Sequence, residues 1–359
     1  MSRMFSLLWN RHKVYRALGV VPVLFTLGLM LWSGYTYALT VVPLIASYNW
    51  WLSVLCVGST TMLWLLSIWA YAVCVYRKPG APAGMAAPAP VQSHDQYTQV
   101  SSHSQPTRAF SRRTPQGRQR YADDDSRSSS DSSSDYAYSD DESPLNAEQL
   151  RRAELVYSIT VRENGQPRFC LKCNGPKPDR THHCSVCGEC VLKMDHHCPW
   201  LNNCVGFRTQ KAFILFVVYC ALYCTLILVT SLIFFFRSLA DMDIDTEISM
   251  NLIFLLISSC AFAIALFVFA IYHIYLVLTN TTTIESYEKN NYRVETARRG
   301  SRAKYVNLFD MGAKKNFIQV FGSSSSWYLW LVPVDTTLGD GVRFPISFEG
   351  YNELRQNLE

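Results

Sequence analysis

The chain has 359 residues, of which 49% are hydrophobic and 17% are charged, and its net charge is +5. This length allows two or three domains, but the averages hide four apolar runs that alternate with a serine-rich insert and a basic tail. The charge bears on membrane topology and not on a nucleic-acid partner, because no basic stripe with interleaved aromatic residues accompanies a recognisable reader motif.

Two apolar runs near the N-terminus predict a helical hairpin in a membrane. Residues 1–13 are basic, residues 14–37 are apolar apart from Arg16, and a second apolar run follows at 50–76. Each run is long enough to cross a bilayer, which needs roughly 20 apolar residues. A signal peptide is the alternative, but its apolar region would be shorter and would end at a small-residue cleavage site. We therefore assign residues 1–78 to an N-terminal tail and two transmembrane helices.

The segment after the second apolar run has the composition of a disordered chain. From residue 79 to residue 143 it is rich in Pro, Ala, Gly, Ser, Asp and Gln, with too little apolar surface to offset the entropy lost on ordering. Serine runs at 128–130 and 132–134 lie among acidic residues, which indicates either a solvated linker or a tether tuned by phosphorylation. The sequence does not decide between them. We assign residues 79–146 to a disordered cytosolic insert.

Two further apolar runs predict a second membrane hairpin within residues 212–279. They cover residues 212–236 and 250–278, and a basic cytosolic tail at 280–359 follows. The N-terminus, the middle segment and the tail are basic, whereas the two short links hold almost no Lys or Arg apart from Arg237. Because basic segments stay in the cytosol, both termini and the middle segment are predicted to be cytosolic. The fold class predicted is an all-α polytopic membrane protein with four transmembrane helices.

A cysteine-rich block, which we assign to residues 147–211, lies between the second and third apolar runs. Seven of the twelve cysteines and four of the eight histidines fall between Cys170 and Cys204. Because cytosolic thiols stay reduced, metal ligation or catalysis is expected here and not disulfide bonding. Six of these cysteines and two of these histidines suffice for two closed, structural Cys3His zinc sites that would stabilise a small domain. The eight candidate ligands are Cys170, Cys173, His183, Cys184, Cys187, Cys190, His197 and Cys204.

One cysteine of the block, Cys198, remains outside these ligands. It ends the sequence Asp195-His196-His197-Cys198, in which one histidine can face a metal while its neighbour faces the thiol. A thiol needs a base to become a nucleophile, and a carboxylate on the imidazole fixes its tautomer and stabilises its cation. Cys198, His196 and Asp195 are therefore a candidate catalytic triad. The alternative, that all of these residues only bind metal, leaves a surplus of ligands beside a membrane.

The residues around this triad resemble the DHHC protein S-acyltransferases, or palmitoyltransferases. The sequence D-H-H-C at 195–198 stands in the pattern C-x2-C-x9-H-C-x2-C-x2-C-x4-D-H-H-C-x5-C and is followed by P-W-L-N-N-C-V-G-F. T-T-I-E at 282–285 is similar to the family's T-T-x-E motif, and the segment ending K-N-F-I-Q-V-F-G at Gly322 is similar to its aromatic-rich C-terminal motif. The resemblance covers both membrane hairpins, the cysteine-rich block and most of the tail, but not the insert.

The resemblance implies an enzyme that acts in two steps. Cys198 would accept a long-chain fatty acyl group, mainly palmitoyl, from acyl-CoA and would pass it to a cysteine of a membrane-associated protein. His196 would be the base, oriented by Asp195. A non-catalytic, membrane-anchored zinc adaptor is the alternative function. A transporter is disfavoured, because the span interiors carry essentially no charge beyond His273.

The resemblance also implies supporting residues and an assignment of the metal ligands. Thr283 would bond the catalytic aspartate, and Glu285 and Asn316 would support the same region. The family arrangement has two interleaved zinc sites. Cys170, Cys173, His183 and Cys190 would form the first, and Cys184, Cys187, His197 and Cys204 the second.

Other residues are candidates for contacts with the substrate. Cys198 lies only about fourteen residues before the third span, so the thiol is expected near the cytosolic membrane surface, with the acyl chain between the spans and CoA in the cytosol. Each candidate also has an ordinary juxtamembrane or packing role as its alternative. The candidates are Lys177, Arg180, Arg208, Lys211, Trp200 and Tyr223.

The expected partners are the lipid bilayer, acyl-CoA and membrane-associated substrate proteins, without nucleic acid. Residues 317–321 suggest a short amphipathic helix that either docks on the zinc domain or lies on the membrane. The pattern W-x-x-P-V-x-T-x-L-G-D-G from Trp330 resembles fungal, vacuole-type members of the family. This favours an endomembrane address such as the vacuole, Golgi or ER membrane.

Overall fold

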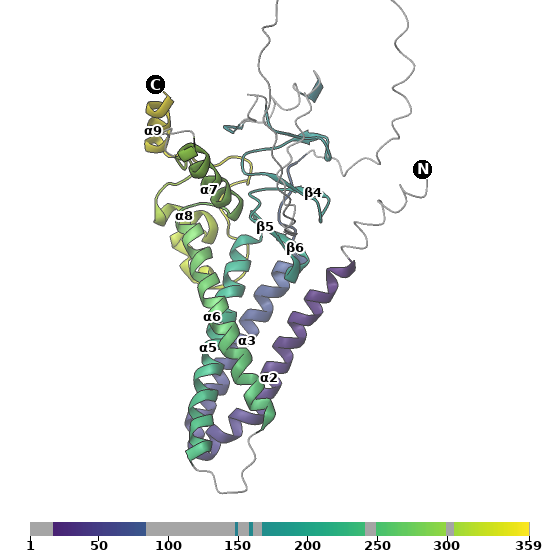
Figure 1. The fold of residues 1–359 in the computed structure, drawn as a ribbon, viewed down its shortest axis with the longest axis vertical. Coiled ribbons are helices and arrows are strands. Elements are labelled where there is room, and N and C mark those ends of the chain that lie inside the picture. The colour runs from purple at the N-terminus through teal and green to yellow at the C-terminus, as the bar shows by residue number, and fades with distance from the viewer. Residues whose placement is uncertain are drawn as a thin grey trace, which may run out of the picture. The chain divides into compact units, whose positions relative to one another are not determined.

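Figure 1 shows the chain in a computed structural model that contains four long apolar helices within the described residues. The described residues are 17–83, 148–149, 158–160, 167–240, 249–298 and 305–358. The four helices are α2 (Val20–Tyr48), α3 (Trp50–Tyr76), α5 (Gln210–Ala240) and α6 (Met250–Leu278). Each is long and apolar enough to cross a membrane, so the chain is an integral membrane protein. The first five residues of the predicted insert, 79–83, are described, and there Pro79 O accepts from Arg208 N over 3.0 Å and Gly80 O from Leu192 N over 2.9 Å. The rest of the insert, the first basic residues and the acidic link before α6 lie outside the described residues.

The first span is longer than the sequence analysis predicted. α2 continues past Tyr37 and through Pro43 to Tyr48. Pro43 removes one helical hydrogen bond, but the residues around it are apolar, and Val41 and Ile45 are fully buried. Packing of this apolar turn therefore keeps the helix intact beyond the expected end at residue 37.

A single residue, Asn49, joins α2 to α3. Its backbone is extended, and its own N–H donates to Ile45 O over 2.8 Å. Its side-chain oxygen accepts from Leu52 N over 3.1 Å, which satisfies one of the free N–H groups at the start of α3. Trp50 and Trp51 follow directly and are exposed, as expected of aromatic residues at a membrane surface.

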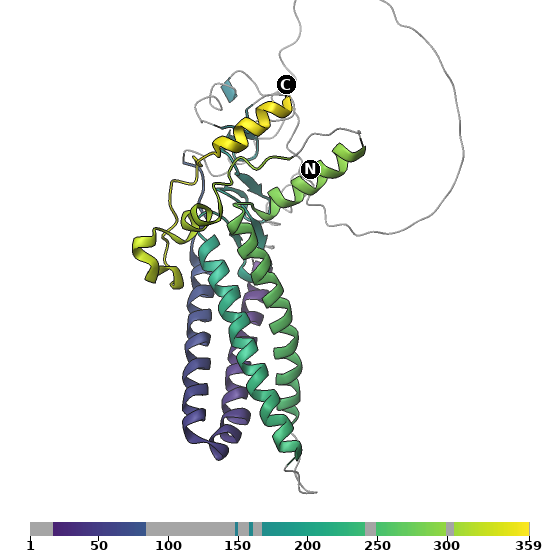
Figure 2. The ribbon, with the colours of Figure 1, turned by 90° about the vertical axis from the view of Figure 1, so that its left-hand side faces the viewer.

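The third span, α5, is the most enclosed of the four. Of its most apolar stretch, 56% is buried, compared with 22% to 28% for the other three spans. It packs against both α3 and α6, and Figure 2 shows α5 and α6 running side by side. Side chains from α5 consequently contribute to both large apolar clusters, Phe213 to the cluster that includes Cys198 and Tyr223 to the cluster farther along the helix.

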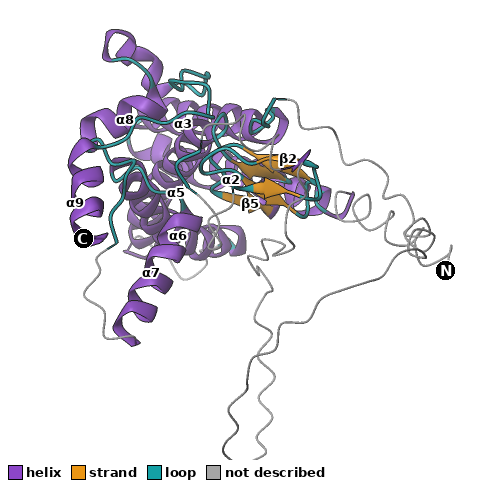
Figure 3. Cartoon of the chain, turned by 90° about the horizontal axis from the view of Figure 1, so that it is seen from above, coloured by secondary structure: helices purple, strands orange, loops and turns teal. Residues whose placement is uncertain are grey.

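The cysteine-rich region folds as three short antiparallel hairpins, coloured as strands in Figure 3. The first pairs β1 (Phe169–Cys170) with β2 (Gly175–Pro176), and the second pairs β3 (His182–Cys184) with β4 (Glu189–Val191). The third pairs β5 (His196–Cys198) with β6 (Asn203–Val205), and the 3-10 turn η1 (Pro199–Leu201) lies between them. This region lies between the second and third spans, which confirms the predicted fold class.

The third hairpin is tied to the end of α3. The side-chain amide of Asn203 donates to Cys74 O and to Arg77 O, each over 2.8 Å, and so satisfies carbonyl groups at the C-terminus of that helix. The Tyr71 hydroxyl donates to Trp200 O over 2.8 Å. These bonds hold the D-H-H-C strand at the end of the membrane helices.

The tail after α6 packs back onto the same end of the spans. It contains α7 (Thr283–Arg298), α8 (Ala313–Phe321), the 3-10 segment η2 (Ser324–Leu331) and α9 (Phe348–Leu358). Asn316 on α8 donates to Leu278 O over 2.7 Å and to Asp310 Oδ1 over 2.6 Å. The Tyr219 hydroxyl of α5 donates to Leu331 O. α8 is thus docked on the protein, against α6 and α5.

Candidate metal centres and active site

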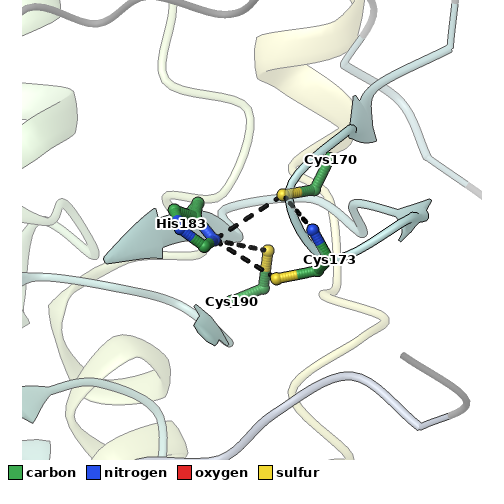
Figure 4. Close-up of side chains that lie close together, drawn as sticks. All are labelled: Cys170, Cys173, His183 and Cys190. Atoms are coloured by element: carbon green, nitrogen blue, oxygen red, sulfur yellow. Dashed lines mark hydrogen bonds between the residues drawn. The ribbon is translucent and has the colours of Figure 1, made fainter. Parts of the chain in front are cut away.

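The first group of potential metal ligands contains Cys170, Cys173, His183 and Cys190, and Figure 4 shows these four side chains converging. The distances from His183 Nδ1 to the three sulfur atoms are 3.6, 3.2 and 3.9 Å. Ligands around tetrahedral zinc, with Zn–S of about 2.3 Å and Zn–N of about 2.0 Å, lie about 3.5 to 3.8 Å apart. The donor atoms therefore have the spacing and chemistry of a tetrahedral metal site.

The second group contains Cys184, Cys187, His197 and Cys204, and it has the same geometry. His197 Nδ1 lies 3.6, 3.4 and 3.6 Å from the three sulfur atoms. The second and third hairpins provide these ligands. Both groups could hold a metal ion, and their members coincide with the two sets that the resemblance implied.

Strand register explains why the two groups interleave. In β3–β4, His183 is paired with Cys190, and in β5–β6, His197 is paired with Cys204. Directly paired residues of antiparallel strands project to the same face, so each pair supplies two ligands side by side. The Cys-x-x-Cys turn of the preceding hairpin supplies the other two. Within each turn, a backbone N–H donates to the first sulfur over 3.3 Å, which stabilises its thiolate.

Cys198 belongs to neither group, because of its position in β5. Side chains alternate between the two faces of a strand. His197 faces the second metal group, so His196 and Cys198 share the opposite face. Cys198 is 7% exposed and packs in the apolar core that includes Ala70, Cys74 and Phe213.

His196 is hydrogen-bonded on one side and interacts with the Cys198 thiol on the other. Its Nδ1 lies 2.6 Å from Asp195 Oδ2. Burial lowers the pKa of His196, but the hydrogen bonds with Asp195 and Cys198 more than offset this effect and raise the pKa to about 9. Burial raises the pKa of Asp195, and its bond to His196 more than offsets this, so that the carboxyl pKa lies below its usual range. The arrangement suits a base that takes a thiol proton.

Thr283, the second threonine of T-T-I-E, contacts Asp195 twice. Its backbone N–H donates to Asp195 Oδ1 over 2.9 Å, and its hydroxyl donates to the Asp195 carbonyl. Thr283 is the first residue of α7, so the partial positive charge of a helix N-terminus also faces the carboxylate. The residue that the resemblance placed near the aspartate therefore contacts it directly.

Glu285 forms a capping box and a buried ion pair. Its carboxylate accepts from Thr282 N over 2.9 Å, and the Thr282 hydroxyl accepts from Glu285 N over 3.2 Å. Arg180 pairs with the same carboxylate through two bonds of 2.7 and 2.8 Å. Arg180 also lies over the rings of Phe309 and Phe344, at 4.7 and 5.2 Å. This network joins the cysteine-rich region to the start of α7 and to the tail.

Asn280 and Asn203 were missed by the sequence analysis. Asn280 stands two residues after the end of the fourth span, has a positive φ of 46°, and accepts from Arg180 Nη1 over 2.9 Å. Asn203 stands opposite Cys198 in the third hairpin and caps α3. An asparagine just after a long apolar run is a recognised helix-end signal, so Asn280 could have been found. The distant helix that Asn203 caps has no signal in the sequence around it.

The basic residues proposed to contact CoA differ in exposure. Arg180 and Lys211 are buried, and the Lys211 ammonium donates to Leu329 O over 2.8 Å and to Thr336 Oγ1 over 2.7 Å. Lys177 is also buried. The Arg208 side chain is 60% exposed and has an ion pair with Asp335 at 3.4 Å. Among the four, Arg208 is the side chain most open to a soluble ligand.

The two aromatic candidates lie at different levels. Trp200 is exposed in η1, with its ring 6.3 Å from that of Phe25. Tyr223 is buried in α5, lies 3.1 Å from Ser33 Oγ through its hydroxyl, and lines a cavity of about 420 Å³ between α2, α3 and α5. The cavity lining is mostly apolar and includes Leu31, Val57 and Trp64, with the hydroxyl-bearing side chains Thr60 and Thr61 among them.

These features define a class of protein: an integral membrane protein with two interleaved Cys3His sites and a free thiol beside a histidine–aspartate pair. Residues 163–290 match the family described as DHHC palmitoyltransferase. Human palmitoyltransferase ZDHHC2 is 32% identical over 361 residues, which cover 97% of this chain and 84% of that protein. For human ZDHHC20 the identity is 32%, with 93% and 79% covered. Palmitoyltransferase PFA3 of Yarrowia lipolytica is 35% identical, with 56% and 55% covered. The chain belongs to the DHHC palmitoyltransferase family.

Proposed function

We propose that the protein is a protein S-palmitoyltransferase whose nucleophile is Cys198. The observation that carries this proposal is the position of that thiol. It is the cysteine of the 170–204 block that stands outside both metal groups, and it lies next to His196, which Asp195 holds at 2.6 Å. Family membership and the palmitoyltransferase relatives support the same activity.

The reaction uses these side chains in two exchanges. His196 takes the proton of Cys198, and the sulfur bonds to the carbonyl carbon of the acyl-CoA thioester. The bond from that carbon to the CoA sulfur breaks, and CoA leaves as a thiol with the proton held by His196. A cysteine of the substrate protein then attacks the acyl-enzyme in the same way and releases Cys198 as a thiol. No net oxidation or hydrolysis occurs.

The two metal groups would hold zinc. Each offers three thiols and one imidazole, with no fifth protein ligand among the described residues, which suits a closed structural site. When bound, zinc would supply folding energy to a region with little core of its own. The second site includes His197, so it would fix the strand that carries His196 and Cys198.

The acyl chain would lie between the spans, and CoA would lie at the cytosolic surface. The cavity lined by Tyr223 offers apolar walls within the membrane-spanning part, where each buried methylene contributes about 0.8 kcal/mol. Trp200 lies in η1, which directly follows Cys198, and the exposed Arg208 stands two residues before α5, so we propose that both meet the head of the cofactor. The other three basic candidates are buried and would affect CoA binding only indirectly, by stabilising the structure around the site. They are Lys177, Arg180 and Lys211.

The proposal includes the orientation of the protein in the membrane and the membrane in which it resides. The basic N-terminus and tail support a cytosolic placement of both termini and of the metal groups. Substrates would be proteins already held at the membrane, since the thiol lies at the end of the spans. The membrane would belong to the endomembrane system, such as the vacuole, Golgi or ER.

Acyl loading of the purified protein tests the nucleophile. Incubation with labelled palmitoyl-CoA should give a hydroxylamine-sensitive label on the wild type and none on Cys198→Ser. Cys260→Ser, which removes an exposed cysteine of α6, is the matched control and should label normally. Full transfer to a substrate protein by Cys198→Ser would refute the assignment. An unlabelled wild type would favour the non-catalytic zinc adaptor.

A further inference from the structure

His273 places a polar atom without a partner inside the spans. It lies on α6, five residues before the C-terminal end of that helix, and it is 4% exposed. Among the described residues, its Nε2 is one of three buried side-chain atoms that have no hydrogen-bond partner. An ionisable side chain within a membrane span is costly and commonly marks a functional site, so this nitrogen calls for an explanation.

The ring of His273 packs in an aromatic cluster that covers the proposed base. Its centroid lies 4.4 Å from that of Phe269 and 5.0 Å from that of Phe213, both in edge-to-face contact. Phe213 in turn contacts the His196 ring edge-on at 5.2 Å. The two imidazole rings, those of His273 and His196, are 5.9 Å apart. His273 therefore stands beside the reacting pair and not in a distant part of the bundle.

Packing alone does not account for a histidine at this position. A phenylalanine would fill the same aromatic cluster and would leave no unsatisfied nitrogen, whose burial costs stability. A buried polar atom that lacks a partner in the free protein is instead suited to a partner that arrives with the substrate. The polar atom nearest to the reacting carbon of a thioester is its carbonyl oxygen.

We propose that His273 is a further catalytic residue, which donates a hydrogen bond from Nε2 to the carbonyl oxygen of the acyl thioester. This inference rests on the proposed function. When Cys198 sulfur bonds to the carbonyl carbon, the carbonyl electron pair moves onto the oxygen, which becomes negative. A neutral imidazole with its proton on Nε2 stabilises that charge, and the apolar ring cluster around it strengthens the interaction. His196 then handles the proton while His273 handles the oxygen.

Three substitutions at one position test this role. His273→Phe retains the ring but removes the donor. His273→Gln places an amide N–H near the position of Nε2, whereas His273→Asn places it near that of Nδ1. We expect His273→Phe to slow single-turnover formation of the acyl-enzyme by about 10² to 10³-fold, at an unchanged half-saturating concentration of palmitoyl-CoA, because the bond strengthens in the transition state. His273→Gln should recover at least about tenfold of this loss and His273→Asn should not.

The controls separate this inference from the function on which it rests. Tyr275→Phe removes an exposed hydroxyl from the same helix and should load at the wild-type rate. Thermal unfolding should show that His273→Phe is as stable as the wild type or more stable. The role of His273 would be overturned if His273→Phe loaded within about twofold of the wild-type rate, or if the Gln and Asn variants loaded at equal rates. In either case Cys198→Ser would still fail to label, so the proposed function would stand. Labelling of Cys198→Ser would instead overturn the proposed function itself.

Discussion

Thr283 holds Asp195 from two sides, through its backbone N–H at 2.9 Å from Oδ1 and through its hydroxyl on the Asp195 carbonyl. The two residues are 88 positions apart in the sequence. The start of α7 is therefore fastened to the strand that carries His196 and Cys198, so the tail after the fourth span contributes to the orientation of the proposed base.

Removal of the Thr283 hydroxyl is expected to slow catalysis with little effect on the fold. Thr283→Val keeps the backbone bond to Oδ1 but loses the bond to the carbonyl, worth about 1 kcal/mol. We expect acyl-enzyme formation to slow by about five- to tenfold, measured by single-turnover labelling with palmitoyl-CoA. Thr279→Val is the matched control, because that hydroxyl bonds only carbonyls of its own helix. Equal rates for the two variants would show that the Thr283 hydroxyl does not position Asp195.

Metal analysis should find two zinc ions per chain. Each Cys3His group has four ligands and no member in common with the other. Cys204→Ser should therefore lose at least one zinc, and it should also lose acyl loading, because it disturbs the strand paired with His197 and Cys198. Elemental analysis of the purified protein provides the count. A wild type with one zinc or none would contradict the assignment, as would Cys204→Ser with two.

The ion pair between Glu285 and Arg180 should make stability fall in acid. Burial raises the pKa of Glu285, but Arg180 and the Thr282 amide more than offset this and hold the pKa below its usual range. A carboxyl with a lowered pKa in the folded state binds fewer protons there than when unfolded. Its stabilising contribution is therefore complete above the unfolded pKa of about 4.3 and is lost as the pH falls through the folded value.

Glu285→Gln is the variant that isolates this effect. Breaking a buried pair on one side leaves Arg180 uncompensated and should cost about 3 kcal/mol near neutral pH. Because acid also releases zinc from thiolates, the quantity to measure is the difference in unfolding temperature between the wild type and Glu285→Gln. That difference should shrink as the pH falls below about 4.3. A difference that stays constant into acid would mean that the ionised carboxylate contributes nothing.

Asn203 should matter for the attachment of the third hairpin to α3. Asn203→Leu removes two bonds to Cys74 O and Arg77 O and leaves both carbonyl groups without that donor. We expect a loss of about 2 kcal/mol in stability, measured by thermal unfolding in detergent. Ser47→Ala, which removes an exposed hydroxyl that bonds Leu44 O of its own helix, is the control and should cost less. A cost for Ser47→Ala equal to that for Asn203→Leu would indicate that the cap is not the source of the stability.

Local patterns predicted the spans and the ligand sets, because hydropathy and Cys-x-x-Cys spacing act over short stretches of chain. The second, third and fourth spans lie within a few residues of the predicted bounds. The first was predicted to end at residue 37, because aromatic residues on both sides of the link are typical of a membrane surface. Only tertiary burial of Val41 and Ile45 shows that the helix continues.

Long-range pairing could not be predicted. Arg180 was expected to meet phosphate groups because it is basic and near the membrane, but its carboxylate partner stands 105 residues away in Glu285. The Lys211 ammonium likewise donates hydrogen bonds to a backbone oxygen and a hydroxyl oxygen of the tail. By contrast, the opposite orientations of His196 and His197 follow from strand alternation alone, once residues 196–198 are recognised as a strand.

The middle hairpin, β3–β4, gives two ligands to each metal group, so the three hairpins form a chain of shared supports. Loss of one ion would destabilise the hairpin that also binds the other ion. Loss of the first ion would therefore weaken the second site, which includes His197, and with it the strand that carries Cys198. As zinc becomes scarce, the activity of this enzyme would therefore fall more steeply than it would with two independent sites. The same coupling would make its maturation depend on two loading events that assist one another.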